Sequence, residues 1–247
     1  MSLDDAAYEM TLDPPGQIVV IGAGPLGIEA ALYGRYLGYE VTVFEKGQIG
    51  ENLRAGSDQP LPMLPDRCLS PLAISALKAQ DGGLKLPGDP TFPMTIGQWL
   101  ECGLMRLAAT DLLAGRVHTN SRVMRIELIP VEASDADAND ADGSDEENDY
   151  FIDGEVPPDY RLTINASDEA TSFDAEAVIF ATGDSPLSDV DGFERVESSA
   201  YLFRIGAGGD AESSDEARFY RGLQEIVATF AKLGGREALD LYRPVRF

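Results

Sequence analysis

The first 45 residues contain two short apolar runs separated by a glycine-rich break. Residues 17–21 (QIVVI) are β-branched and apolar, which is typical of a buried strand. Residues 28–38 then place apolar side chains at helical spacing, and residues 39–45 form a second, alternating strand. A strand, a glycine-rich turn, a helix and a strand within about 30 residues form a βαβ unit. The pattern therefore predicts a parallel sheet.

Two helices are expected in the middle of the chain. The first covers residues 71–80, where Ser70 can act as N-cap and a proline stands at the first helical position. The second runs from about residue 96 to 113. It is preceded by Thr95 and Gln98 at the spacing of a capping box, and its apolar residues share one face.

The next region has the alternation of an antiparallel sheet. Residues 116–129 and 159–166 are both strand-like and predict a β-meander, and residues 176–183 form a fully apolar strand that ends in glycine. Between the first two strands lies a low-complexity acidic run, residues 131–158. Such a composition cannot bury enough apolar surface to become ordered. We expect it to be a disordered insertion in the meander.

The C-terminal part predicts one more strand and one more helix. Residues 199–210 run as a strand into a glycine turn, and residues 215–233 have a strong apolar helical face, preceded by Ser213 and Glu216 as a capping box. Together these elements predict a single three-layer α/β domain of residues 13–247. A parallel sheet would carry helices on one face and the antiparallel meander on the other.

Charge and composition narrow the class of protein. The chain has a formal net charge of −24, and residues 131–160 contain 12 Asp or Glu and no Lys or Arg, so this stretch supplies half of it. That field would repel a phosphate backbone, so we expect no nucleic-acid partner. No apolar run approaches the roughly 18 residues of a membrane span, and the acidic N-terminus does not resemble a signal peptide. We therefore expect a cytoplasmic protein without a membrane partner.

Few side chains are candidates for direct chemistry. Cys68 and Cys102 are 34 residues apart and form no Cys-x-x-Cys motif, and His118 is the single histidine. We therefore expect no resident metal, and we name no catalytic residue. Alternating aspartates from 135 to 142 could suggest a calcium loop, but the closing glutamate and the flanking helices are missing. The oligomeric state cannot be predicted from these patterns.

The glycine-rich break between the first strand and helix has the chemistry of a dinucleotide site. Gly22, Gly24 and Gly27 have the spacing G-x-G-x-x-G. The first glycine permits the tight turn, the second lets a pyrophosphate approach the backbone, and the third lets the helix pack closely on the sheet. Glu45 ends the second strand, where a carboxylate would accept the ribose hydroxyls. The sequence therefore predicts a dinucleotide site.

From these residues onward the chain resembles the flavoprotein oxidoreductases with two dinucleotide-binding domains. That group includes flavin-containing monooxygenases, dienoyl-CoA reductases and pyridine nucleotide–disulfide reductases. Residues 47–56 resemble its loop with an arginine near the flavin pyrophosphate, and the strand ending Ala-Thr-Gly at 183 resembles its second marker. Residues 203–210 resemble its third, a strand followed by glycine and aspartate, with the acid displaced to Asp210.

The resemblance implies FAD as the cofactor, with NAD(P) in the same loop as the alternative. The cofactor-binding residues expected from the motif and the resemblance are Gly22, Gly24, Pro25, Leu26, Gly27, Glu45, Lys46, Arg54, Val123, Thr182, Gly183, Gly206 and Asp210.

The chain departs from that group in one respect that affects function. A full member has a second glycine fingerprint, for NAD(P)H, between the second and third markers, whereas here only residues 183–200 intervene. A further βαβ unit needs about 30 residues. Three hypotheses follow: a compact FAD-dependent oxidoreductase that takes electrons from a small reductant or a partner protein, a dinucleotide-binding module without turnover, or an NAD(P)-dependent dehydrogenase.

Overall fold

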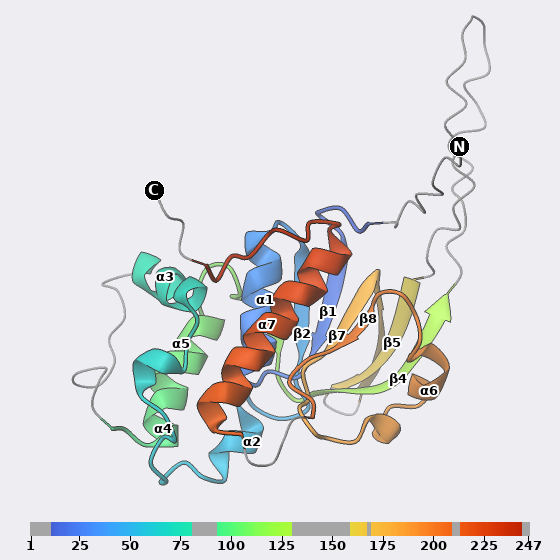
Figure 1. The fold of residues 1–247 in the computed structure, drawn as a ribbon. Helices are drawn as coiled ribbons and strands as arrows, with labels where there is room; N and C mark the ends of the chain where they lie inside the picture. The colour runs from blue at the N-terminus through green and yellow to red at the C-terminus, as the bar shows by residue number, and fades with distance from the viewer. Residues whose placement is uncertain (1–10, 81–92, 130–158, 167–168, 209–212, 244–247) are drawn as a thin grey trace, which may run out of the picture.

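The computed structural model describes residues 11–80, 93–129, 159–166, 169–208 and 213–243, and these form three layers (Figure 1). The middle layer is a five-stranded parallel sheet with strand order β3-β2-β1-β7-β8. Helices α1 (Pro25–Tyr36) and α7 (Asp215–Leu233) cover one face. A three-stranded antiparallel meander, β4-β5-β6, lies against the other. This arrangement confirms the predicted α/β class.

The parallel sheet is built around its most apolar strand. Its strands are β1 (Gln17–Ile21), β2 (Glu40–Phe44), β3 (Val117–His118), β7 (Ala177–Phe180) and β8 (Leu202–Arg204). In the central strand Ile18 pairs with Val41 on one side and Ala177 on the other, and all three are fully buried. A strand covered on both faces reads as a continuous apolar run, as residues 17–21 do.

The meander differs from the expectation at both of its ends. Its strands are β4 (Ser121–Ile129), β5 (Asp159–Ala166) and β6 (Glu169–Ala175). The single strand predicted over 116–129 is broken at Asn120, whose φ is 51°, and the part before the break joins the parallel sheet as β3. Strand β6 was not expected because most of its residues are exposed and polar. The acidic run 131–158 lies outside the described residues.

Short helical segments connect the strands elsewhere in the described part of the chain. They are α2 (Glu51–Arg54), η1 (Pro65–Arg67), α3 (Pro71–Ala79), α4 (Ile96–Trp99), the π-helical η2 (Leu100–Leu104), α5 (Met105–Ala108), η4 (Leu187–Asp189) and α6 (Phe193–Val196). Two of the predicted caps are confirmed: the Ser70 hydroxyl accepts from the Ala73 amide, and Thr95 and Gln98 form both bonds of a capping box.

Two predicted helix ends are wrong. The helix expected over 96–113 ends at Ala108, where the Thr110 hydroxyl donates to the carbonyl of Leu107 and competes with continued helix. The long C-terminal helix is capped by Ser214, not Ser213, because the Ser214 hydroxyl accepts from the Ala217 amide. Glu216 instead forms an ion pair with Arg67, at 2.8 Å.

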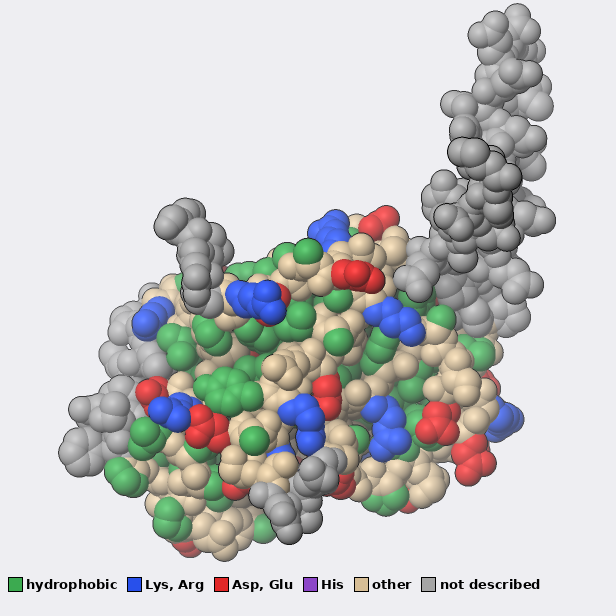
Figure 2. All heavy atoms as spheres, in the orientation of Figure 1, with side chains coloured by type: hydrophobic (Ala, Val, Ile, Leu, Met, Phe, Trp, Pro, Cys, Tyr) green, Lys and Arg blue, Asp and Glu red, His purple; other side chains and the backbone are tan. Residues whose placement is uncertain are grey.

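The surface mixes the two signs of charge. On the face covered by α1 and α7, acidic and basic side chains alternate with apolar ones (Figure 2). Among the described residues, no helix combines the length and the apolar character that crossing a bilayer requires.

One buried acid ties the first helix to the third. Glu29 of α1 is 1% exposed, and its two carboxyl oxygens accept from the backbone amide and the hydroxyl of Ser70, at 2.8 and 2.6 Å. Burial outweighs these hydrogen bonds and raises the pKa of Glu29 to about 7. The carboxyl therefore holds a proton in the folded protein under conditions in which it is ionised in the unfolded chain.

The proton on Glu29 predicts a pH dependence of stability. Because the folded pKa is raised, the folded state binds more protons than the unfolded chain, and the free energy of unfolding falls as pH rises from about 4.5 to about 7. The loss approaches roughly 3 kcal/mol. Urea unfolding of wild type and Glu29→Gln at about pH 5 and pH 8 measures it. Between these two pH values, the free energy of unfolding of wild type should fall by roughly 3 kcal/mol more than that of the variant. Parallel pH profiles of the two proteins would contradict the raised pKa of Glu29.

Candidate functional site

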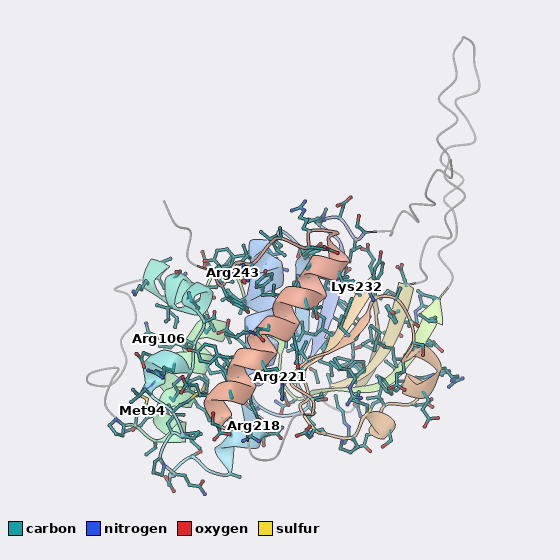
Figure 3. All side chains as sticks on the ribbon, in the orientation of Figure 1. Met94, Arg106, Arg218, Arg221, Lys232 and Arg243 are labelled. Atoms are coloured by element: carbon teal, nitrogen blue, oxygen red, sulfur yellow. The ribbon has the colours of Figure 1, made fainter. Side chains whose placement is uncertain are left out.

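A cavity of about 700 Å³ opens at the carboxyl ends of the parallel strands. Its walls include the turns that follow β1, β2, β7 and β8, together with α2 and the first half of α7. Figure 3 places Arg218 and Arg221 in that half of α7. Ligands of open α/β sheets bind at this edge, because the strands end there and adjacent connections diverge. The topology therefore puts the glycine-rich turns and the cavity in one place.

The three glycines of the first turn have different steric surroundings. Gly22 has a φ of 107°, and a Cβ there would stand 2.7 Å from the carbonyl oxygen of Ala181. A Cβ on Gly27 would stand 1.9 Å from the carbonyl oxygen of Gly22. At Gly24, by contrast, a Cβ would meet nothing within 4 Å. The first and third glycines thus allow close packing of the chain on itself, whereas the second borders the cavity.

The N-terminus of α1 presents donors without acceptors. The amides of Gly24, Leu26 and Gly27 have no hydrogen-bond acceptor among the described residues, and Pro25 has no amide hydrogen. The first turn of α1 also contains no acidic residue, and no side chain caps it. Unpaired amides at a helix N-terminus carry partial positive charge and bind anions. This end of α1 is therefore suited to a phosphate or another anion.

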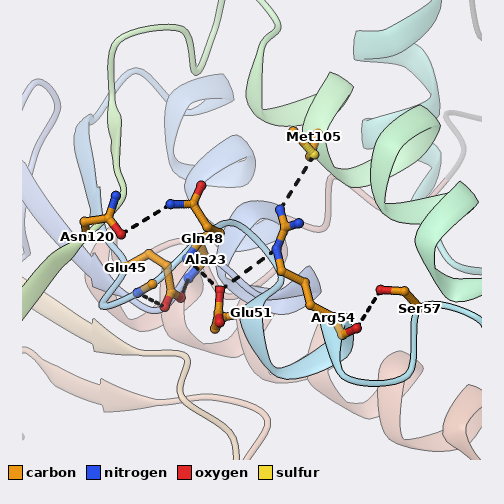
Figure 4. A network of polar contacts seen from close by, with 9 residues as sticks. Ala23, Glu45, Gln48, Glu51, Arg54, Ser57, Met105 and Asn120 are labelled. Carbon is orange, nitrogen blue, oxygen red and sulfur yellow. Dashed lines mark hydrogen bonds and ion pairs between the residues drawn. The ribbon is translucent and has the colours of Figure 1, made fainter.

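Glu45 lies beside this turn and is held by two backbone amides (Figure 4). It is 7% exposed and lines the cavity. One of its oxygens accepts from the Ala23 amide at 2.8 Å, and the other accepts from the Gly47 amide at 2.9 Å. A carboxylate has about four lone-pair sites, so roughly two remain for hydroxyl donors. The geometry thus orients Glu45 and leaves acceptor capacity for a ligand.

The other expected site residues divide into four groups. Pro25, Leu26, Lys46, Val123, Thr182, Gly183 and Gly206 line the cavity with Gly22, Gly24 and Glu45. Gly27 supports the turn from beneath. Arg54 does not line the cavity: its guanidinium lies 3.9 Å from both a Glu51 oxygen and the Met105 sulfur (Figure 4). Asp210 lies outside the described residues.

Several cavity residues had no clear signal in the sequence. One wall is apolar and comes from distant segments: Leu61, Met63, Trp99 and Phe219. Trp99 is buried, with 2% exposure, yet it also borders the cavity. Asp184 and Arg221 also line it. Only the tertiary structure brings these segments together, because no local pattern marks them.

The side chains of the described residues offer no activated nucleophile. Cys68 lines the cavity, but burial raises the pKa of its thiol to about 12, so the thiol stays protonated at neutral pH. His118 is exposed and does not line the cavity; its ring stacks on Phe44, which does, with 5.5 Å between ring centroids. Within the described ranges, no group of three His, Cys, Asp or Glu side chains could hold a metal ion.

The surroundings of the two glycines predict different effects on stability when each is replaced by alanine. We expect Gly27→Ala to destabilise the protein by at least about 2 kcal/mol, because the added methyl would overlap a backbone oxygen that only a backbone shift can move. That cost exceeds the gain in helix propensity of about 1 kcal/mol. Gly24→Ala should change stability by less than about 0.5 kcal/mol. Urea unfolding of both variants measures this, and equal effects would show that the two glycines do not differ in role.

Comparisons with known proteins agree with the first βαβ unit. Residues 17–59 match the model of the pyridine nucleotide-disulphide oxidoreductase family. No curated protein matches the chain.

Among solved structures, the chain is similar to two bacillithiol disulfide reductases, Bdr (YpdA). The enzyme from Staphylococcus aureus is 15% identical, with a TM-score of 0.42 over 79% of this chain and 46% of that one. The enzyme from Bacillus cereus is 17% identical, with a TM-score of 0.44 over 89% and 56%. An S-allyl-L-cysteine S-oxygenase from Allium sativum is 16% identical, with a TM-score of 0.39 over 68% and 36%.

The chain thus spans about half the length of the two reductases. The match to the family model is confined to residues 17–59, the segment from β1 through α2 and the residues just after it. That segment carries the glycine-rich turn and Glu45.

Proposed function

We propose that the cavity binds FAD and that the chain is a flavin-dependent oxidoreductase. The observation that carries the proposal is the contrast within the first turn. The amides at the N-terminus of α1 have no acceptor in the described part of the chain, and Gly24 leaves open space where any side chain would project. A dinucleotide pyrophosphate needs both features.

Glu45 supports the binding of a dinucleotide at the same turn. Its carboxylate is fixed by the amides of Ala23 and Gly47, so its remaining acceptor positions point toward the cavity it lines. Ribose hydroxyls are the donors that an acid at the end of this strand binds in dinucleotide sites. Lys46, which makes no ion pair with any described residue, lies next to it and lines the cavity. The adenosine half of FAD would therefore be held by β2, and the pyrophosphate by α1.

The apolar wall supports a place for a ring system. Leu61, Met63, Trp99 and Phe219 border the cavity and would exclude water from a flat aromatic group. Bound flavin would supply the redox chemistry, which no described side chain supplies. The chain itself would bind the cofactor, orient it and keep water from one side of it.

The source of electrons is proposed to lie outside this domain. The connection from β7 to β8 contains only η4 and α6, and so leaves no room for a second βαβ unit. We therefore propose that a small reductant or a partner protein delivers the electrons. The cysteines are both free thiols, which fits a reducing compartment, and we propose a cytoplasmic location.

The test is retention of FAD. After incubation with excess FAD and gel filtration, we expect about one flavin per chain in the protein fraction. Gly24→Val should fold and lose the flavin, because its branched side chain would occupy the open space while its extended backbone tolerates valine. Ala114→Val, at an exposed position outside the cavity, is the matched control and should retain the flavin.

Other outcomes would select the alternatives. Flavin that is retained and reduced by dithionite, but not reoxidised by any acceptor, would favour a binding module without turnover. Saturable binding of NAD(P)H without retention of flavin would favour a dehydrogenase that uses the same turn. Absence of both kinds of binding would contradict the dinucleotide site itself.

A further inference from the structure

The turn that follows β8 forms part of the cavity wall. Gly206 and Gly208 both line the cavity and have positive φ angles, 69° and 70°. A Cβ on Gly208 would meet no atom within 4 Å, and one on Gly206 would meet only the side chain of Leu26. Glycine adopts many backbone conformations at similar cost, so its contacts select the one observed. At this turn those contacts include hydrogen bonds to charged side chains.

Two residues of α7 hold both ends of the turn. The Gly206 amide donates to a Glu225 carboxylate oxygen at 2.6 Å, and the Arg221 guanidinium donates to the carbonyl of Gly208. The same two side chains pair with each other, with 3.5 Å between the Arg221 Nε and the other Glu225 oxygen. They are four residues apart, on one face of the helix. Figure 3 labels Arg221 on that helix.

A third contact ties this turn to the turn after β7. The Gly208 amide donates to a carboxylate oxygen of Asp184 at 2.8 Å. Asp184 directly follows Gly183, which also has a positive φ, 59°. Two carboxylates from separate segments thus accept from the two glycine amides, and the turns after β7 and β8 are held against each other.

The glycine turns therefore offer different chemistry to a ligand. At the first turn, the amides of Gly24, Leu26 and Gly27 find no acceptor in the described segments. At the last turn, the amides of Gly206 and Gly208 are already bonded to carboxylates. An anionic group would be attracted to the first and repelled from the last. The amides of Gly206 and Gly208 are therefore not available to an anionic group.

We propose that Glu225 and Arg221 are positioning residues for the cofactor, which hold the Gly206–Gly208 turn in the shape that closes the cavity on bound FAD. The inference rests on the proposed function and extends it to residues that no motif marks. Glu225 does not line the cavity, so it acts through the turn, whereas Arg221 lines it. From the sequence, the acid expected at this turn was Asp210. Asp210 lies outside the described residues, and the acidic contacts described at this turn come from Glu225, within α7, and Asp184, just after β7.

The first measurement compares FAD affinity and thermal stability in three variants. Glu225→Ala removes the acceptor of the Gly206 amide and should weaken FAD binding about tenfold or more. Glu225→Gln keeps an oxygen acceptor and loses the charge facing Arg221, so its affinity should be intermediate. Glu216→Ala, on the same helix, removes an ion pair with Arg67 at the surface and should bind FAD as wild type does. Melting temperatures should remain close to wild type in all three.

A second measurement follows the turn without cofactor. Amide hydrogen exchange in the FAD-free protein should be accelerated at Gly206 in Glu225→Ala, with the amides of β1 and β7 unchanged. Wild-type affinity in Glu225→Ala would overturn the positioning role while FAD binding itself stands. Loss of affinity accompanied by faster exchange across the whole core would also overturn it, since the effect would then be global unfolding. If wild type retains no FAD, the proposed function fails, and the positioning role fails with it.

Discussion

The approach of helix α1 to the central strands is the contact on which the site depends. Gly27 lies directly over the carbonyl of Gly22, so closely that a single methyl group would overlap it. This contact sets where α1 begins relative to β1 and β7, and it turns the first amides of the helix toward the cavity. The buried carboxyl of Glu45 completes the arrangement by accepting from the Ala23 amide within the same turn. Stability and binding geometry therefore share one set of backbone contacts.

The electrostatics of the cavity differ from those of the whole chain. A protein with a net charge of −24 is a poor general environment for a phosphate group. In the cavity, Arg122, Arg218 and Arg221 are each paired with an acid, so they contribute little net positive field. The attraction for an anion then falls to Lys46 and to the unpaired amides of α1. A helix whose first turn lacks acidic residues retains this capacity, whereas α7 neutralises its own N-terminus with Asp215 and Glu216.

The described side chains around the cavity are arranged for contact with a ligand and include no activated thiol or imidazole. The raised pKa of Cys68 keeps the thiol neutral, and His118, which stacks on Phe44, does not line the cavity. Glu29 has a pKa near neutrality, but it is enclosed against Ser70 and does not line the cavity. A cofactor with its own redox chemistry is consistent with such a site, because the protein need only supply position and field.

The sequence by itself determined the elements whose signals are local. The run at 17–21, the glycine spacing and Glu45 fixed the first βαβ unit, because strand, turn and helix each depend on neighbouring residues. The caps at Ser70 and Thr95 were found for the same reason. Strand β6 was missed because a mostly polar, exposed strand forms only when its partner β5 is in place. The break at Asn120 was missed as well.

Only the tertiary structure decided which distant residues share the site. Arg54 has the position of a cofactor residue along the chain, yet its guanidinium lies against Glu51 and Met105. Trp99 and Arg221 line the cavity although no local pattern marks them. Glu225 reaches Gly206 because α7 folds back beside β8. Sequence spacing specifies contacts along one element, whereas contacts between elements depend on packing, which a one-dimensional pattern does not encode.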